Sequence, residues 1–259
     1  IPEEELWFQF EMALGELDKY QVQEENASYY LDYGDENWKD SANHDFQFMV
    51  EQDLAFASYI PYYFKKWIEQ IDTNVLPLVS KRIINNTCKI LNFNYTDTLE
   101  RAYKVPAENI LYIHGKALSS KKLVVGHHDI STFQYGAVSP FNAAEEHGIY
   151  IQDDDEDFRI TETKEIIKAY FQKTYKDTFG IIQMNQNFFD SLININEIFI
   201  LGHSLSSVDM DYFVEIRKRV LHSCKWYISY FSESDLDNME YFAKRLDIKN
   251  FQPVMLSNL

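Results

Sequence analysis

The sequence predicts an α/β protein, with a Rossmann-like parallel sheet, flanking helices and an N-terminal helical layer. Three observations predict this fold. Apolar residues recur at helical spacing up to about residue 71. Short runs rich in Ile, Val, Phe and Tyr follow from residue 88 onward. The last three of these runs alternate with helical patterns, and this β-α-β order implies parallel strands joined by right-handed crossovers.

We assign residues 1–87 to a helical layer or insertion packed on the sheet, and residues 88–259 to the Rossmann-like domain. Pro61 lies inside one helical pattern and is expected to kink or break it, since proline lacks a backbone donor. The predicted elements of this layer are a helix over 2–24, a polar loop over 25–43 and a helix over 44–71.

In the sheet domain, each predicted strand is a short apolar run, and each predicted helix repeats its apolar residues every three or four positions. The acidic run at 153–157 is expected to be a solvated loop, because like charges repel one another into solvent. The predicted strands are 88–93, 110–113, 122–126, 197–201, 225–230 and 252–256, and the predicted helices are 161–174, 181–193, 208–222 and 233–246.

The composition of the chain argues against several classes of function. A formal net charge of −17 repels a polyphosphate backbone, so we expect no nucleic-acid partner. No apolar run reaches about 18 residues and no signal peptide heads the chain, so we expect no membrane span and a cytoplasmic location. Two cysteines are too few for a disulfide framework or a four-cysteine zinc site.

Two predicted strands end in residues that could carry chemistry. Asn94 follows the strand at 88–93, and its amide could orient a ribose hydroxyl or a water. His114 and Gly115 follow the strand at 110–113, where an imidazole could act as a general base beside a residue that leaves room for substrate. The alternatives are structural: Asn94 and its neighbours could cap a helix, and His114 could be a hydrogen-bonded core residue.

A third strand end lies at Gly202-His203-Ser204, after the apolar run at 197–201. Its backbone N–H groups and the helix that follows could face an anionic or hydroxyl-bearing ligand. Asp209 is the best helix cap in this segment, and it could instead bind a ribose. An ordinary strand-turn-helix is the structural alternative.

Other site types are disfavoured. The adjacent His127 and His128 would point to opposite sides of an extended chain, so we predict no metal site. Neither a Gly-x-Gly-x-x-Gly nor a Walker-type glycine loop occurs in the sequence, so no phosphate cradle can be located.

An ordered set of motifs spans nearly the whole sequence. The motifs are Trp7-Phe8-Gln9-Phe10-Glu11, Phe93-Asn94-Tyr95-Thr96 with Leu99-Glu100, Ile113-His114-Gly115, Gly126-His127, Leu201-Gly202-His203-Ser204-Leu205, Asp209 and Tyr212-Phe213. Taken together, they resemble the AbiH family of bacterial abortive-infection proteins. The family normally begins with a strand and a Gly-Asn-Gly-Phe-Asp turn, an element that does not occur in this chain.

The same layout is similar, more distantly, to sirtuin-like NAD-binding domains. That resemblance implies NAD as ligand or substrate, with Asn94 on the nicotinamide ribose or a water and His114 as the general base. Thr96 stands where the sirtuin pattern has Asp, and the zinc-binding cysteines of sirtuins are absent, which favours simple NAD cleavage over deacetylation. The implied cofactor-binding residues are Asn94, Tyr95, Thr96, Gly115, Gly202, His203, Ser204 and Asp209.

Two functional hypotheses follow. In the first, the protein is an antiphage effector and an NAD glycohydrolase, with His114 and Asn94 as catalytic residues. In the second, it is a non-catalytic module that senses a nucleotide or a phage component and acts through a protein partner, or as a homo-oligomer. Exposed Tyr and Trp on the N-terminal helices would favour the second hypothesis, because such residues dominate interface cores.

Overall fold

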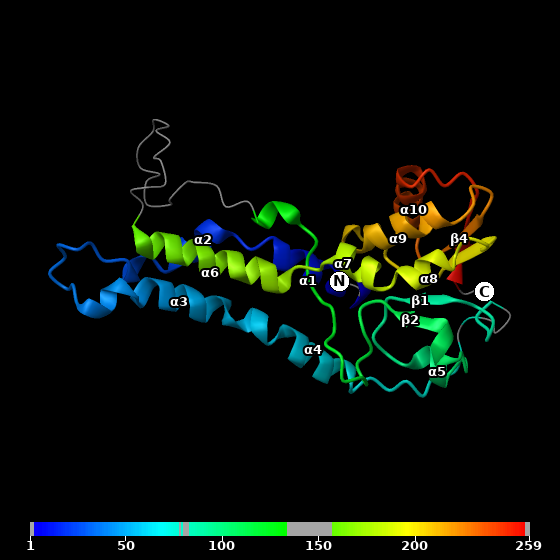
Figure 1. Ribbon diagram of the computed structural model, residues 1–259, viewed down its shortest axis with the longest axis horizontal. Helices are drawn as coiled ribbons and strands as arrows, with labels where there is room; N and C mark the ends of the chain where they lie inside the picture. The colour runs from blue at the N-terminus through cyan, green and yellow to red at the C-terminus, as the bar shows by residue number, and fades with distance from the viewer. Residues whose placement is uncertain (1–2, 78, 80–82, 134–156, 257–259) are drawn as a thin grey trace. The chain divides into compact units, whose positions relative to one another are not determined.

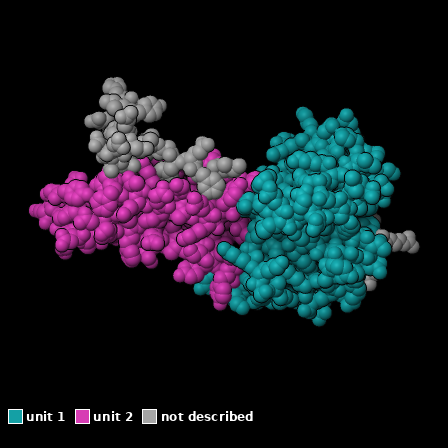
Figure 2. Space-filling view, in the orientation of Figure 1, with its two compact units in different colours: residues 1–9, 63–124, 176–259 teal, residues 10–62, 125–175 magenta. Residues whose placement is uncertain are grey.

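The structure is a computed structural model that describes residues 3–77, 79, 83–133 and 157–256. These residues form two compact units (Figure 2). The first contains residues 1–9, 63–124 and 176–259, and the second contains residues 10–62 and 125–175. The sequence-based division at residue 87 stays a prediction, because these units describe compact packing rather than independent folding.

The second unit is helical. Helices α3 (Asp45–Leu54) and α6 (Phe158–Thr174) run side by side at its centre (Figure 1). Their facing positions recur at helical spacing, so Phe46, Val50 and Ile167 share one core and are fully buried. The predicted helix over 161–174 is therefore confirmed.

Both long helices predicted for the N-terminal layer are broken. The first is α1 (Glu3–Gly15) followed by α2 (Lys19–Glu25), because the Asp18 carboxylate caps α2 by accepting the N–H groups of Tyr20 and Gln21. The second is α3, a 3₁₀ turn and α4 (Ile60–Ile68). Pro61 lies in the first turn of α4, where its missing N–H leaves no helical bond unmade.

The loop between α2 and α3 is fixed to the start of α6 by one buried arginine. Arg159 is 1% exposed, and its guanidinium donates to the Asp157 carboxylate and to the Leu31 carbonyl. The same group lies 4.1 Å from the ring centroid of Tyr30 and 4.6 Å from that of Tyr33. Burial and the neighbouring Asp157 carboxylate raise the pKa of Tyr30 to about 12.

Asp157 thus differs from its predicted role. Its carboxylate caps α6 by accepting the Arg159 N–H, and the same carboxylate pairs with the Arg159 guanidinium. The rest of the predicted acidic loop, residues 153–156, lies outside the described residues.

The first unit contains two small parallel sheets. Strand β1 (Ile90–Asn92) pairs with β2 (Ile110–Tyr112). Strands β3 (Glu197–Ile200), β4 (Lys225–Tyr230) and β5 (Phe251–Met255) pair in that order. The predicted parallel pairing is confirmed, whereas one complete Rossmann sheet stays a prediction.

Helices lie between these strands in the predicted order. The apolar faces of α9 (Met210–Arg219) and α10 (Ser234–Arg245) share a core with Ile200 and Ile228, which removes these side chains from water. The predicted helix over 181–193 is two short helices that meet near Asn185. The helices of this unit that follow β1 are α5 (Thr98–Arg101), α7 (Thr178–Met184), α8 (Gln186–Asp190), α9 (Met210–Arg219) and α10 (Ser234–Arg245).

One strand prediction is wrong: residues 122–126 do not form a strand. The Val124 N–H donates to the His114 carbonyl, and His127 makes an isolated bridge with Tyr175, so the segment is held by single contacts and not by a ladder. Across the described ranges, no helix combines the length and apolar character that a membrane span requires.

Candidate functional site

The carboxyl ends of three strands meet in the first unit. Phe93 follows β1, His114 follows β2 and His203 lies shortly after β3. The Phe93 ring centroid lies 5.7 Å from that of His114 and 4.4 Å from that of His203. The strand ends of parallel sheets are where α/β proteins place their ligands, so this convergence marks the candidate site.

A buried carboxylate lies at the centre of this cluster. The Asp209 Oδ1 atom is 3.2 Å from the Lys176 ammonium and 3.3 Å from His114 Nε2. The other oxygen, Oδ2, is 3.6 Å from His203 Nε2. Lys176 is fully buried, so its charge and that of Asp209 interact with little screening by water, and His114 beside them is only 3% exposed. Among the described residues, His114 Nε2 has no hydrogen-bond partner, so it lies beside the Asp209 carboxylate without being bonded to it.

The surroundings of Asp209 keep it ionised. Burial alone would raise the pKa of its carboxyl group, because a low dielectric disfavours charge. The close imidazoles of His114 and His203 and the charge of Lys176 outweigh this effect and hold that pKa well below its usual range. The carboxylate can therefore accept a hydrogen bond or stabilise a neighbouring positive charge.

The turn after β3 orients one of the two histidines. The Leu205 N–H donates to His203 Nδ1 over 2.9 Å, so a neutral His203 ring carries its proton on Nε2, the nitrogen that faces Asp209. This turn needs left-handed backbone at two positions, with φ of 59° at Gly202 and 56° at Leu205. Glycine adopts such a φ freely, whereas leucine is strained there, and strain of this kind often occurs at functional turns.

Several predicted site residues lie at this turn or next to it. Gly202 and Ser204 are exposed. Gly115 has a φ of 88°, and a Cβ there would lie 3.2 Å from the Lys122 carbonyl oxygen, so glycine is required by its backbone. Asn94 is exposed, and the residue after β1 that contacts the two imidazoles is Phe93.

The prediction that Asp209 caps a helix is wrong. Its side chain makes no capping hydrogen bond at the start of α9. Ser206 does the capping instead, since its hydroxyl accepts the Val208 N–H at the 3₁₀ turn that precedes α9. The carboxylate of Asp209 faces Lys176 because an ion pair offers a buried carboxylate more stabilisation than a single backbone donor.

The predicted residues Tyr95 and Thr96 line a separate, small pocket of about 180 Å³ in the same unit. Tyr95 is buried, and its hydroxyl donates to the Val124 carbonyl. Asp97, at the rim, pairs with Arg101 over 2.7 Å and accepts the Thr73 hydroxyl. These contacts hold the pocket wall together and leave the Thr96 side chain partly exposed beside it.

Sequence reasoning missed Lys176, the counter-ion of Asp209. The residue lies between α6 and α7, away from every strand end and outside any recognisable motif. A lysine in such a place is expected at the surface, because lysine is almost never fully buried unless it is paired. Only the folded chain reveals the pairing.

His127 lies in the second unit and has a structural role there. Its Nε2 contacts the Phe171 carbonyl oxygen at 3.2 Å, and its Nδ1 accepts the Asp129 N–H. Burial lowers the pKa of His127, so the ring stays neutral. Throughout the described part of the chain, no group of three or more His, Cys, Asp or Glu side chains is placed to hold a metal ion.

Comparison with known proteins gives one clear relationship. No curated protein and no solved structure matches the chain. Residues 2–230 match a protein family described as bacteriophage abortive infection AbiH, which indicates a role in abortive infection. The similarity to sirtuins stays a prediction. Because the match covers most of its length, the chain belongs to the AbiH family.

Proposed function

We propose that this protein acts in abortive infection by binding NAD or a related nucleotide at the three strand ends and cleaving its glycosidic bond. The observation that carries the proposal is the position of His114, a strand-end imidazole 3.3 Å from an ionised, buried carboxylate. A histidine beside a carboxylate can act as a general base, since the carboxylate stabilises the imidazolium that forms.

In this proposal, His114 takes a proton from the water that attacks the anomeric carbon of the nicotinamide ribose. The bond from that carbon to the nicotinamide nitrogen breaks, and nicotinamide leaves as a neutral molecule. Asp209 stabilises the charged His114, and Lys176 and His203 position Asp209. Asn94 and Ser204, both exposed, contact the ribose hydroxyls. Cofactor depletion would then arrest the infected cell.

Access to His114 requires movement, because the residue is only 3% exposed. We assign this movement to the turn from Gly202 to Leu205. Gly202 and Ser204 are exposed, and the strained Leu205 makes the present conformation of the turn costly to hold. An opening of this turn would uncover the imidazole of His203 and the Phe93 ring that contacts both imidazoles.

The proposal predicts that the protein releases nicotinamide from NAD and that His114→Ala slows this release by about 100-fold or more, the usual range for loss of a general base. Nicotinamide is followed by chromatography with and without phage infection. His222→Ala, which removes an exposed histidine of the same unit, is the matched control and should keep the parental rate. Absence of release under both conditions, or equal rates for parent and His114→Ala, would exclude the proposal.

A second function is favoured by one helix face. Aromatic side chains on α4 and just before it are exposed, with 66% of Tyr63 and 56% of Trp67 accessible to solvent. Exposed Tyr and Trp are typical of protein interfaces, which supports a non-catalytic sensing module that acts through a partner. Protection against phage without nicotinamide release would favour this function over NAD cleavage.

A further inference from the structure

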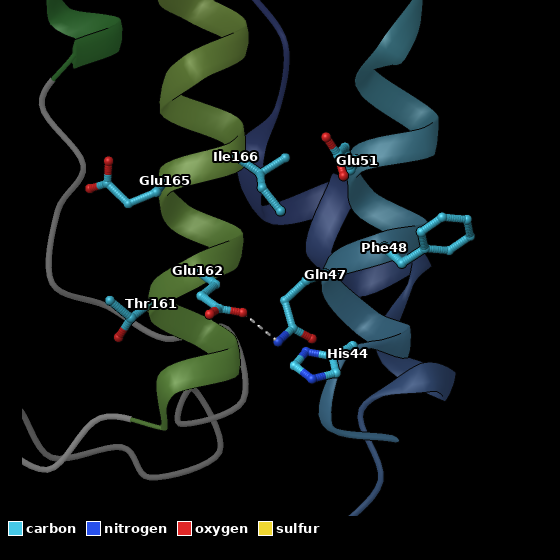
Figure 3. A pocket seen from close by; sticks show the side chains of 8 residues that line it. All are labelled: His44, Gln47, Phe48, Glu51, Thr161, Glu162, Glu165 and Ile166. Carbon is cyan, nitrogen blue, oxygen red and sulfur yellow. Dashed lines mark hydrogen bonds between the residues drawn. The ribbon is translucent and has the colours of Figure 1, made fainter. Parts of the chain in front are cut away.

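The helical unit contains a groove that is separate from the strand ends. It lies between α3 and α6 and has a volume of about 450 Å³ (Figure 3). Phe48 and Ile166 contribute carbon to its walls, while Glu51 and Glu162 contribute carboxylates. Figure 3 shows Gln47 and Glu162 pointing toward one another across the space between the two helices.

Gln47 lines this groove, and among the described residues its side-chain oxygen accepts no hydrogen bond. Its amide nitrogen donates to the Asn43 carbonyl over 2.8 Å and to Glu162 over 2.9 Å. These two acceptors fix the orientation of the amide, so its oxygen must point elsewhere. Among the described residues, no donor reaches Gln47 Oε1, although the residue is only 5% exposed. A buried acceptor of this kind is costly and indicates a missing donor.

The charge around this acceptor is negative. Glu51 and Glu162 are exposed, and within the described ranges neither forms an ion pair with a basic side chain. Glu165, one turn further along α6, differs because Lys168 lies 3.2 Å from its carboxylate. The groove therefore combines unneutralised carboxylates, an orphaned acceptor and an apolar wall.

We infer that this groove binds an aliphatic chain that ends in an ammonium or guanidinium group. The cationic head donates to Gln47 Oε1 and Glu162, and the aliphatic stem lies against Phe48 and Ile166, as cationic side chains commonly do on apolar surfaces. A bare metal ion is a poor fit, because no group of three or more His, Cys, Asp or Glu side chains in the described part of the chain is placed to hold one. The inference does not depend on the proposed nucleotide site.

Two sources share this chemistry, a free polyamine and the basic side chains of a peptide. Calorimetric titration of the full chain with spermidine and, separately, with a hexa-arginine peptide distinguishes them. We expect at least one probe to bind, and Glu162→Gln to weaken that binding by about tenfold, since a charged hydrogen bond becomes a neutral one. This variant keeps an oxygen acceptor for the Gln47 amide, so the local fold is retained.

Glu165→Gln is the matched control, because it makes the same charge change on the same helix at a carboxylate already paired with Lys168. It should weaken binding by less than twofold. Gln47→Met, which removes the orphaned oxygen, should weaken binding while thermal unfolding of the chain stays cooperative. Equal weakening by Glu162→Gln and Glu165→Gln, or no binding of either probe in 150 mM salt, would overturn the inference.

Discussion

Replacement of Asp209 by asparagine is expected to lower the free energy of unfolding by about 3–5 kcal/mol, because it breaks the buried ion pair that Asp209 forms with Lys176. Urea unfolding of both proteins measures this change as a shift in midpoint with an unchanged slope. Lys176→Met should cost a similar amount, since it leaves the Asp209 carboxylate buried without its ammonium partner.

The double variant Asp209→Asn with Lys176→Met is the control for this interpretation. It removes both charges, so it should recover much of the stability that either single variant loses. A double variant whose loss equals the sum of the two single losses would show that the two side chains act independently. The buried ion pair would then not be the source of the effect.

The same carboxylate makes stability depend on pH. The pKa of Asp209 lies below its usual range in the folded protein, so its stabilisation is complete above the unfolded value of about 3.9 and is lost as pH falls toward the folded value. The free energy of unfolding should therefore fall more steeply below about pH 4 for the parent than for the double variant.

Replacement of Arg159 by methionine is expected to cost about 2–4 kcal/mol and to release the loop between α2 and α3. The change removes the ion pair with Asp157 and the cation–π contacts with Tyr30 and Tyr33. The expected loss of stability is smaller than that for a fully buried pair, because the Asp157 side chain is 18% exposed. Hydrogen exchange of residues 29–40 should accelerate, and the unfolding midpoint should fall.

One further variant separates charge from geometry at Arg159, and a second, at Arg219, is the control. Arg159→Lys keeps the charge but loses the planar fork, so it should fall between the parent and Arg159→Met. Arg219→Met removes an arginine whose pairs with Asp190 and Glu215 lie on a helix surface, and it should change stability little. Equal effects of Arg159→Met and Arg219→Met would contradict the role assigned to the buried arginine.

Strand ends could be predicted from the sequence because they are local patterns. The apolar runs before His114 and His203 have the length and β-branched composition of strands, and both histidines follow parallel strands in the structure. Helix breaks were harder to predict. The helix breaks before Asp18 because its carboxylate caps the start of α2, and apolar spacing alone does not show where a new helix starts.

The assembly of the site could be predicted only in part. The sequence predicted one ligand site from three strand ends, with Asn94, His114 and Ser204 as contacts, because parallel strands end at one edge of a sheet. The predicted contact from the first strand was Asn94, whereas the residue that contacts the imidazoles is Phe93. Either of two neighbouring residues can face the site when a strand ends in a turn. Lys176 could not be predicted, since its pairing joins two segments 33 residues apart in the sequence, and no local pattern encodes that contact.

The central claim, that the three strand ends bind a nucleotide, is tested most directly by titrating NAD into the full chain while the ring signals of its 7 histidines are followed by NMR. The signals of His114 and His203 should shift together and saturate, while that of His127, buried in the other unit, should stay in place. No shift at millimolar NAD, or shifts confined to other histidines, would contradict the claim.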